Sequence, residues 1–161
     1  MIKEINLFFL TFFMIGKIKF APGTLASIAA CLLFLLLLNI FSFTFVFLFT
    51  LITFVYSLWA INNSFDEFKT EDPQEIVKDE VVGQMLTLLA IPIYETLYPL
   101  PLIYYCASSF LLFRFFDVLK PYPINFVDEN VKGSFGIMFD DILASLYSII
   151  ILIIIFFFLG G

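Results

Sequence analysis

The polar stretch at residues 114–141 carries the residue types that could do chemistry in this chain. Apolar runs of membrane length lie on both sides of it. Charged groups in such a place are costly, and a segment that keeps them there indicates a function. The stretch contains the carboxylates Asp117, Asp128, Glu129, Asp140 and Asp141, with the cations Arg114, Lys120 and Lys132 between them.

A second acidic pair, Asp79 and Glu80, directly precedes another apolar run. Carboxylates favour a hard cation such as Mg²⁺, which takes oxygen ligands from protein, water and phosphate. The chain has no histidine, which excludes a phosphohistidine intermediate, a Ser-His-Asp triad and histidine-ligated zinc. Because Arg and Lys can neutralise a reacting phosphate, the sequence predicts metal-dependent phosphate chemistry, with a lipid phosphate as substrate if the site lies at a membrane surface.

Arg114, Asp117 and Lys120 follow one another at intervals of three residues, which places them along one helix face. Pro121 predicts that this helix ends there. Two interpretations stay open, an intrahelical salt bridge or a phosphate clamp beside a metal-binding aspartate. Asp140 and Asp141 are expected to open the last helix, where one aspartate would suffice as an N-cap.

The elements that must position these groups are membrane helices. Apolar residues make up 62% of the chain and the mean hydropathy is +1.07, which is too apolar for a soluble globule. We expect one all-α domain over residues 1–161, a polytopic helical bundle with four to five spans. The expected spans are 25–40, 43–61, 81–93, 100–116 and 142–159.

The segments between the spans have their own expected structures. Residues 1–15 are apolar but short, so we expect an interfacial or re-entrant segment. Residues 16–24 read as a basic turn, after which Thr24 or Ser27 could cap a helix. Residues 62–80 are expected to form mostly a solvated loop or a short surface helix, and residues 94–99 a tight turn.

Counting crossings places residues 1–24, 62–80 and 117–141 on one side of the membrane. All eight Lys and Arg residues fall on or beside that side, which the positive-inside rule makes cytoplasmic. Every acidic residue except Glu95 lies there too, so we expect the polar segments to form one site at the cytoplasmic interface. A divalent-cation transporter is an alternative, but it would need carboxylates through the membrane depth, and the expected spans carry none at mid-depth. A metal-dependent lipid phosphotransferase of the CDP-alcohol type would carry a D-G-x-x-A-R pattern, which is absent.

Four motifs carry a resemblance to a known family: A-P-G-T-L-A-S at 21–27, I-V-K-D-E-V-V-G at 76–83, F-R-F-F-D-V-L-K-P-Y-P-I at 113–124 and D-E-N-V-K-G-S-F-G-I-M-F-D-D at 128–141. Their order and spacing resemble those of phosphatidylglycerophosphatase A, a family of bacterial membrane phosphatases, over about residues 16–150. Ala26 stands where many members carry glycine, which bears on how closely that turn approaches substrate.

The resemblance implies Mg²⁺-dependent removal of the terminal phosphate of phosphatidylglycerophosphate, at the cytoplasmic face of a bacterial inner membrane, without a nucleic-acid partner. It makes Asp79, Glu80, Asp117 and Asp141 the expected Mg²⁺ ligands, with Asp140 as a further ligand or the base. Arg114 and Lys120 are expected to clamp the phosphate, and Asp128 to position the metal ligands without itself binding the metal. Thr24 and Ser27 either contact the phosphate or cap the helix.

Overall fold

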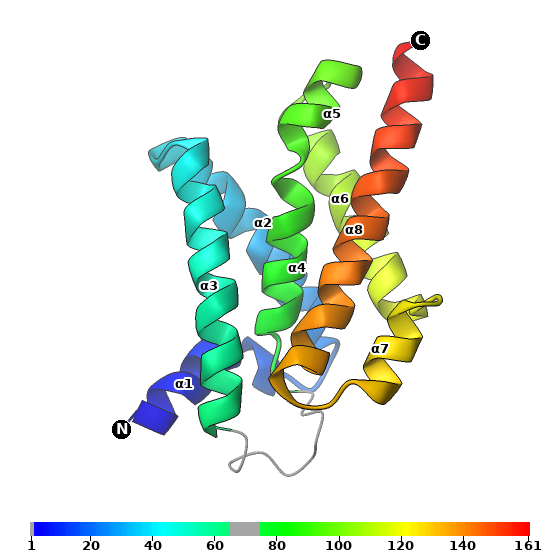
Figure 1. Ribbon diagram of the computed structural model, residues 1–161. Helices are drawn as coiled ribbons and strands as arrows, with labels where there is room; N and C mark the ends of the chain where they lie inside the picture. Colours follow the sequence, from blue (N-terminus) through cyan, green and yellow to red (C-terminus); the bar gives the residue numbers. More distant parts are fainter. Residues whose placement is uncertain (1, 65–74) are drawn as a thin grey trace.

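The computed structural model describes residues 2–64 and 75–161, so most of the acidic segment expected as a loop at 62–80 lies outside the described residues. The described chain is helical and contains no strand, which confirms the all-α prediction (Figure 1). Its elements are α1 (Ile2–Leu10), a 3₁₀ turn η1 (Ile15–Lys17), α2 (Pro22–Ile40), α3 (Phe43–Ser64), α4 (Lys78–Leu88), α5 (Ile91–Leu97), α6 (Leu102–Leu119), α7 (Ile124–Asn130) and α8 (Gly133–Gly160).

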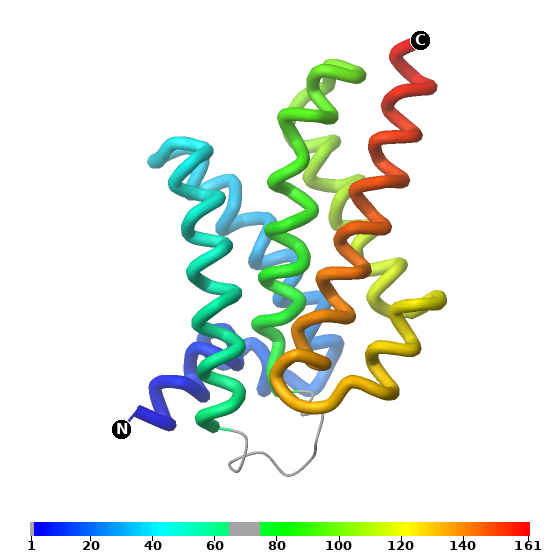
Figure 2. Tube along the Cα trace, in the orientation of Figure 1, coloured from blue at the N-terminus to red at the C-terminus, as the bar shows by residue number. Residues whose placement is uncertain are grey.

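Four of the described helices, α2, α3, α6 and α8, are long and apolar enough to cross a membrane. The more polar α4 lies among them and packs chiefly on α2 and α8. Figure 2 shows the chain continuing from α4 into α5 toward the end of the bundle where the C-terminus lies. Since its neighbours cover Val81, Met85 and Leu88 completely, this broken helix can run through the bundle without being apolar all round.

Close packing at Gly83 joins the three helices that carry most of the candidate residues. A Cβ atom at Gly83 would lie 2.7 Å from the Phe113 ring of α6 and 3.1 Å from the Asp141 carbonyl oxygen of α8. The Ser145 hydroxyl also donates a hydrogen bond of 2.6 Å to the Gly83 carbonyl. The absence of a side chain at Gly83 therefore lets α4, α6 and α8 meet one turn from Asp79 and Glu80.

The last helix begins earlier than the sequence analysis predicted. It starts at Gly133, so Asp140 and Asp141 lie about two turns inside α8 and the prediction that they open the helix is wrong. The segment between Gly133 and Asp140 is mostly apolar and can bury one helical face. Because this segment was counted as part of the polar stretch, the predicted start of the helix was too late. Gly133 has a φ of 77°, a conformation that glycine adopts without steric cost.

Two local predictions near the turns also need correction. α2 begins at Pro22 after Ala21 and has no side-chain cap, so neither Thr24 nor Ser27 caps it; proline suits the first helical position because it lacks an N–H. Residues 94–99, expected as a turn, are mostly within α5. By contrast, the predicted helix end before Pro121 is confirmed, since Lys120 follows α6 with a φ of 43°.

The N-terminal segment lies against the end of the bundle where α4 and α8 begin (Figure 1). Its outer side exposes apolar side chains, including Ile5, Phe8, Phe13 and Met14. Exposed apolar side chains beside Lys17 and Lys19 are typical of a segment that lies in a membrane interface, which is one of the two arrangements predicted for residues 1–15.

Candidate active site

A cavity of about 490 Å³ opens where the starts of α2, α4 and α8 meet the end of α6 and α7. It brings together segments that are far apart in the sequence, as the crossing count predicted. The predicted site residues that line it are Thr24, Asp79, Glu80, Arg114, Asp117, Lys120, Asp128, Asp140 and Asp141. Ser27 is not among the lining residues, because it is fully buried and its hydroxyl donates a hydrogen bond of 2.9 Å to the Gly23 carbonyl.

Three carboxylates, from Asp79, Glu80 and Asp141, offer ligand oxygens that all lie within 4.8 Å of one another. One oxygen of each is buried without a hydrogen-bond partner in the described chain: Asp79 Oδ1, Glu80 Oε2 and Asp141 Oδ2. Buried carboxylate oxygens normally have partners, and converging oxygens are the ligands of a hard divalent cation. This carboxylate triad therefore has the donor chemistry and the spacing for such an ion.

The electrostatics at the start of α4 agree with a missing positive charge. Burial raises the pKa of Asp79 well above its ordinary value, and the neighbouring Glu80 carboxylate raises it further. Burial likewise raises the pKa of Glu80, to about 7. Both shifts mean that two negative charges in this buried place are unfavourable, and a cation between them would remove that cost.

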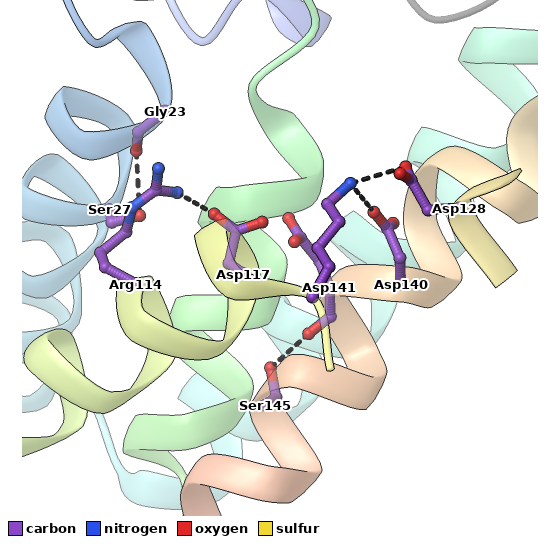
Figure 3. A network of polar contacts seen from close by, with 9 residues as sticks. Gly23, Ser27, Arg114, Asp117, Asp128, Asp140, Asp141 and Ser145 are labelled. Atoms are coloured by element: carbon purple, nitrogen blue, oxygen red, sulfur yellow. Dashed lines mark hydrogen bonds and ion pairs between the residues drawn. The ribbon is translucent and has the colours of Figure 1, made fainter. Parts of the chain in front are cut away.

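Asp117 and Asp140, in contrast, face cationic side chains (Figure 3). Arg114 Nη1 donates to Asp117 Oδ2. Lys120 Nζ donates to Asp140 Oδ2 at 2.8 Å and to Asp128 Oδ1 at 2.6 Å. The R-x-x-D-x-x-K run thus forms its salt bridge at Arg114–Asp117 only, because the left-handed backbone at Lys120 turns that side chain toward α7 and α8.

These ion pairs bear on the roles expected from the sequence. Asp117 lies beside the carboxylate triad and not within it, so its role as a metal ligand stays a prediction. Burial alone would lower the pKa of Lys120, but the Asp140 and Asp128 carboxylates raise it above its ordinary value. Lys120 is therefore charged at neutral pH and holds α7 against α8 at the cavity wall.

The start of α2 contributes to the lining of the cavity through Ala21, Pro22, Gly23 and Thr24. A Cβ atom at Gly23 would collide with Glu80 Oε1 and lie 3.2 Å from Arg114 Nη1. The first N–H groups of a helix have no intrahelical acceptor and attract anions. Gly23 therefore lets Glu80 and Arg114 approach a helix end suited to phosphate.

Gly23 was expected only as part of a turn and was not among the predicted site residues, although a glycine directly after a helix-starting proline was an available signal. Ala26, where the resembling family often has glycine, is fully buried in the core and does not line the cavity. Lys132 and Gly136 also line the cavity, and a side chain at Gly136 would collide with the Val131 carbonyl. Gly136 thus allows the chain before α8 to fold against its first turn.

A family model and two similar proteins carry the same family name. A family model described as Phosphatidylglycerophosphatase A matches residues 8–156. A protein of that name from Haemophilus influenzae is 37% identical over 136 residues, covering 84% of this chain and 79% of the relative. One from Escherichia coli is 32% identical over 133 residues, covering 83% and 73%.

A third relative carries a different name. The Bacteroides thetaiotaomicron protein named "Putative phosphatidylinositol-3-phosphatase" is 37% identical over 142 residues, covering 85% of this chain and 84% of the relative. No solved structure matches the chain.

Proposed function

The chain belongs to the phosphatidylglycerophosphatase A family and is thus a phosphatase of phospholipid metabolism, and from this premise we propose that it removes the terminal phosphate of phosphatidylglycerophosphate with the help of Mg²⁺. The observation that carries the proposal is the carboxylate triad, whose buried oxygens lack partners in the described chain. An orphaned set of oxygens inside a cavity is best explained by a ligand that completes it.

The charge of the cavity supports the need for a cation. Carboxylates outnumber the cationic side chains Arg114, Lys120 and Lys132 among the described lining residues. A phosphate monoester carries nearly two negative charges at neutral pH and would be repelled by such a surface. Asp79, Glu80 and Asp141 would hold the ion, which when bound neutralises charge on the phosphoryl group.

The chain's own cations and backbone then orient the phosphate. Arg114 Nη1 lies beside Gly23, and its Nε is buried without a partner in the described chain. The guanidinium can therefore bind a phosphate oxygen while keeping its bond to Asp117. Residues 21–24 at the start of α2 line the same cavity, so a phosphate bound there could accept hydrogen bonds from the first N–H groups of that helix.

Asp140 is the residue we assign to proton transfer. One of its oxygens accepts a hydrogen bond from Lys120, whereas Oδ1 is buried without a partner in the described chain. A carboxylate held by one oxygen and free at the other can orient a water and accept its proton. Attack by that water at phosphorus would break the ester bond, and the proton taken up by Asp140 would pass to the leaving glycerol oxygen, giving inorganic phosphate and the lipid alcohol.

The substrate class follows from the family and from the membrane setting. The names of the three relatives share one chemistry, a phosphate monoester on a phospholipid headgroup. We propose phosphatidylglycerophosphate as the substrate, bound at the cytoplasmic face of a bacterial membrane, where the positive-inside rule orients the cavity.

The test is phosphate release by the purified full-length chain in detergent. Phosphatidylglycerophosphate, phosphatidic acid and phosphatidylinositol 3-phosphate are offered separately, each with Mg²⁺ and with EDTA. We expect release from the first lipid, abolished by EDTA. Release from phosphatidylinositol 3-phosphate alone would overturn the proposed substrate, and release in EDTA would overturn the metal dependence. No release from folded protein would overturn the proposed reaction and favour metal transport.

A further inference from the structure

A buried lysine directly precedes the acidic pair at the start of α4. Lys78 is 3% exposed, and in the described chain no carboxylate forms an ion pair with it. The positive end of a helix dipole is also an unfavourable place for a cation. A buried charge in such a place needs compensation.

The compensation comes from two aromatic rings of the N-terminal segment. Lys78 Nζ lies 4.2 Å from the ring centroid of Phe9 and 4.4 Å from that of Phe12. Both distances are within the range of a cation–π contact, which is strongest when the cation is desolvated. The side chain therefore fastens α4 to the last turn of α1, through Phe9, and to Phe12 just after it.

Further contacts tie the same two segments together. The Val77 N–H donates a hydrogen bond of 3.1 Å to the Leu10 carbonyl. Leu10 is fully buried in a cluster with Ile76 and Val82 of the α4 region. A side chain at Gly16 would collide with the Glu75 carbonyl. Residues 75–78 thus rest on the N-terminal segment at several successive positions.

The N-terminal segment is itself anchored on its other side, to α3. Asn6 is fully buried, donates to the Ser64 hydroxyl at 3.1 Å and accepts a hydrogen bond of 2.9 Å from the Tyr56 hydroxyl. The backbone then turns through residues 12–14 with φ values of 43°, 56° and 73°. The left-handed conformation is unfavourable for residues other than glycine, so this turn persists because its contacts hold it.

We propose that Lys78 is a positioning residue: by fixing the first turn of α4 on Phe9 and Phe12, it sets the carboxylates of Asp79 and Glu80 at the spacing that a divalent cation needs. The N-terminal segment would then be a brace for the carboxylate triad as well as a membrane contact. The inference rests on the proposed metal site, and its main readout is metal binding, which is independent of the lipid substrate.

Charge and geometry predict opposite signs when Lys78 is altered. If the ammonium acted only through its charge, Lys78→Met would remove a repulsive group beside the triad and tighten binding of a divalent cation. If it acts by positioning, Lys78→Met loosens the triad and weakens binding. Phe12→Leu changes no charge, so it should leave affinity unchanged in the first case and weaken it in the second.

The experiment measures Mn²⁺ binding to the full-length chain in detergent by electron paramagnetic resonance. We expect Lys78→Met and Phe12→Leu each to weaken Mn²⁺ binding about three- to tenfold, as loss of a cation–π contact would. Lys78→Arg, which keeps the cation over the rings, should stay within about twofold. In the phosphatase assay, the Mn²⁺ concentration for half-activation should rise while kcat at saturating Mn²⁺ changes little.

Tyr105→Phe is the matched control, because it removes the hydrogen bonds of a buried residue to Tyr98 and Leu100 at the opposite end of the bundle. It should leave Mn²⁺ affinity unchanged. Tighter binding in Lys78→Met, or equal weakening in Tyr105→Phe, would overturn the inference. If the wild-type chain binds Mn²⁺ with this dependence on Lys78 but releases no phosphate, the proposed function fails while the positioning role stands.

Discussion

The two ends of the helical bundle bury polar groups in different ways. At the end formed by α5 and the start of α6, the Tyr105 hydroxyl donates to the Tyr98 carbonyl and accepts from the Leu100 N–H, each at 2.6 Å. At the cavity end, carboxylate oxygens of Asp79 and Asp141 are buried without partners in the described chain. Buried polar groups that have hydrogen-bond partners stabilise the fold, whereas buried polar groups without partners indicate a place where a ligand can bind.

This comparison predicts that changes at the cavity end act on activity, while equally buried changes at the α5 end act on stability alone. The largest effect should come from the carboxylate triad. Asp79→Asn and Asp141→Asn should each lower phosphate release by about a hundredfold or more, since even outer partners of metal ligands cost 10–100-fold. Tyr105→Phe should keep near-normal turnover.

The assay is phosphate release at saturating Mg²⁺, with circular dichroism to show that each variant is folded. Near-normal turnover in both triad variants would mean that the orphaned oxygens serve no metal. Asp117→Asn sharpens the assignment: a loss equal to that of Asp79→Asn would bring Asp117 into the metal site despite its bond to Arg114.

A next largest effect is expected from two glycines that stand at opposite ends. Gly23→Ala places a methyl group against Glu80 Oε1, and Gly160→Ala places one against the Leu97 carbonyl. We expect Gly23→Ala to lower activity about ten- to a hundredfold, as when a partner of a metal ligand is lost, with little change in Tm. Gly160→Ala should lower Tm and leave activity intact, and the reverse pattern would contradict the functional contrast between the ends.

The pH dependence of stability should also separate the two ends. Because the pKa of Glu80 is raised to about 7 in the folded chain, the folded state binds more protons than the unfolded state between the ordinary Glu value and 7. This contribution to stability is present at low pH and is lost as pH rises through about 7. In EDTA, thermal unfolding of the wild-type chain should therefore show a higher Tm at pH 5.5 than at pH 8.

Mg²⁺ should reduce that difference by stabilising the folded chain at pH 8, where Glu80 is ionised. Glu80→Gln should flatten the pH dependence, whereas Tyr105→Phe should shift Tm equally at both pH values. An unchanged pH dependence in Glu80→Gln would contradict the assignment of this titration to the cavity end.

The smallest effect within the cavity is expected at its exposed wall. The Lys120–Asp128 pair is about one-third exposed (28% and 34%), and such pairs contribute roughly 0–1 kcal/mol. Asp128→Asn should leave Lys120 bonded to Asp140. It should lower activity by no more than about threefold, because a fold-change of that size corresponds to a free energy below about 1 kcal/mol. A loss as large as that of Asp79→Asn, measured in the same assay, would place Asp128 among the groups that hold the ion.

Much of this architecture could be predicted from local sequence. Hydropathy identified the helices that became α2, α3, α6 and α8, and counting their crossings predicted which polar segments would meet. The motif around Arg114 and Asp117 identified the chemistry. Errors concentrated at helix starts, where the mostly apolar segment after Gly133 belonged to the helix, and where Pro22 began a helix without a side-chain cap.

The sequence by itself therefore determined that this chain is a helical membrane phosphatase with its carboxylates at one end, because hydropathy, charge placement and motifs are properties of short segments. Only the tertiary structure decided which carboxylates share a site, that Asp117 and Asp140 instead face cations, and that Lys78 rests on Phe9 and Phe12. Those facts depend on the rotation and close approach of helices far apart in the chain, which glycines such as Gly23 and Gly83 permit and which no local pattern encodes.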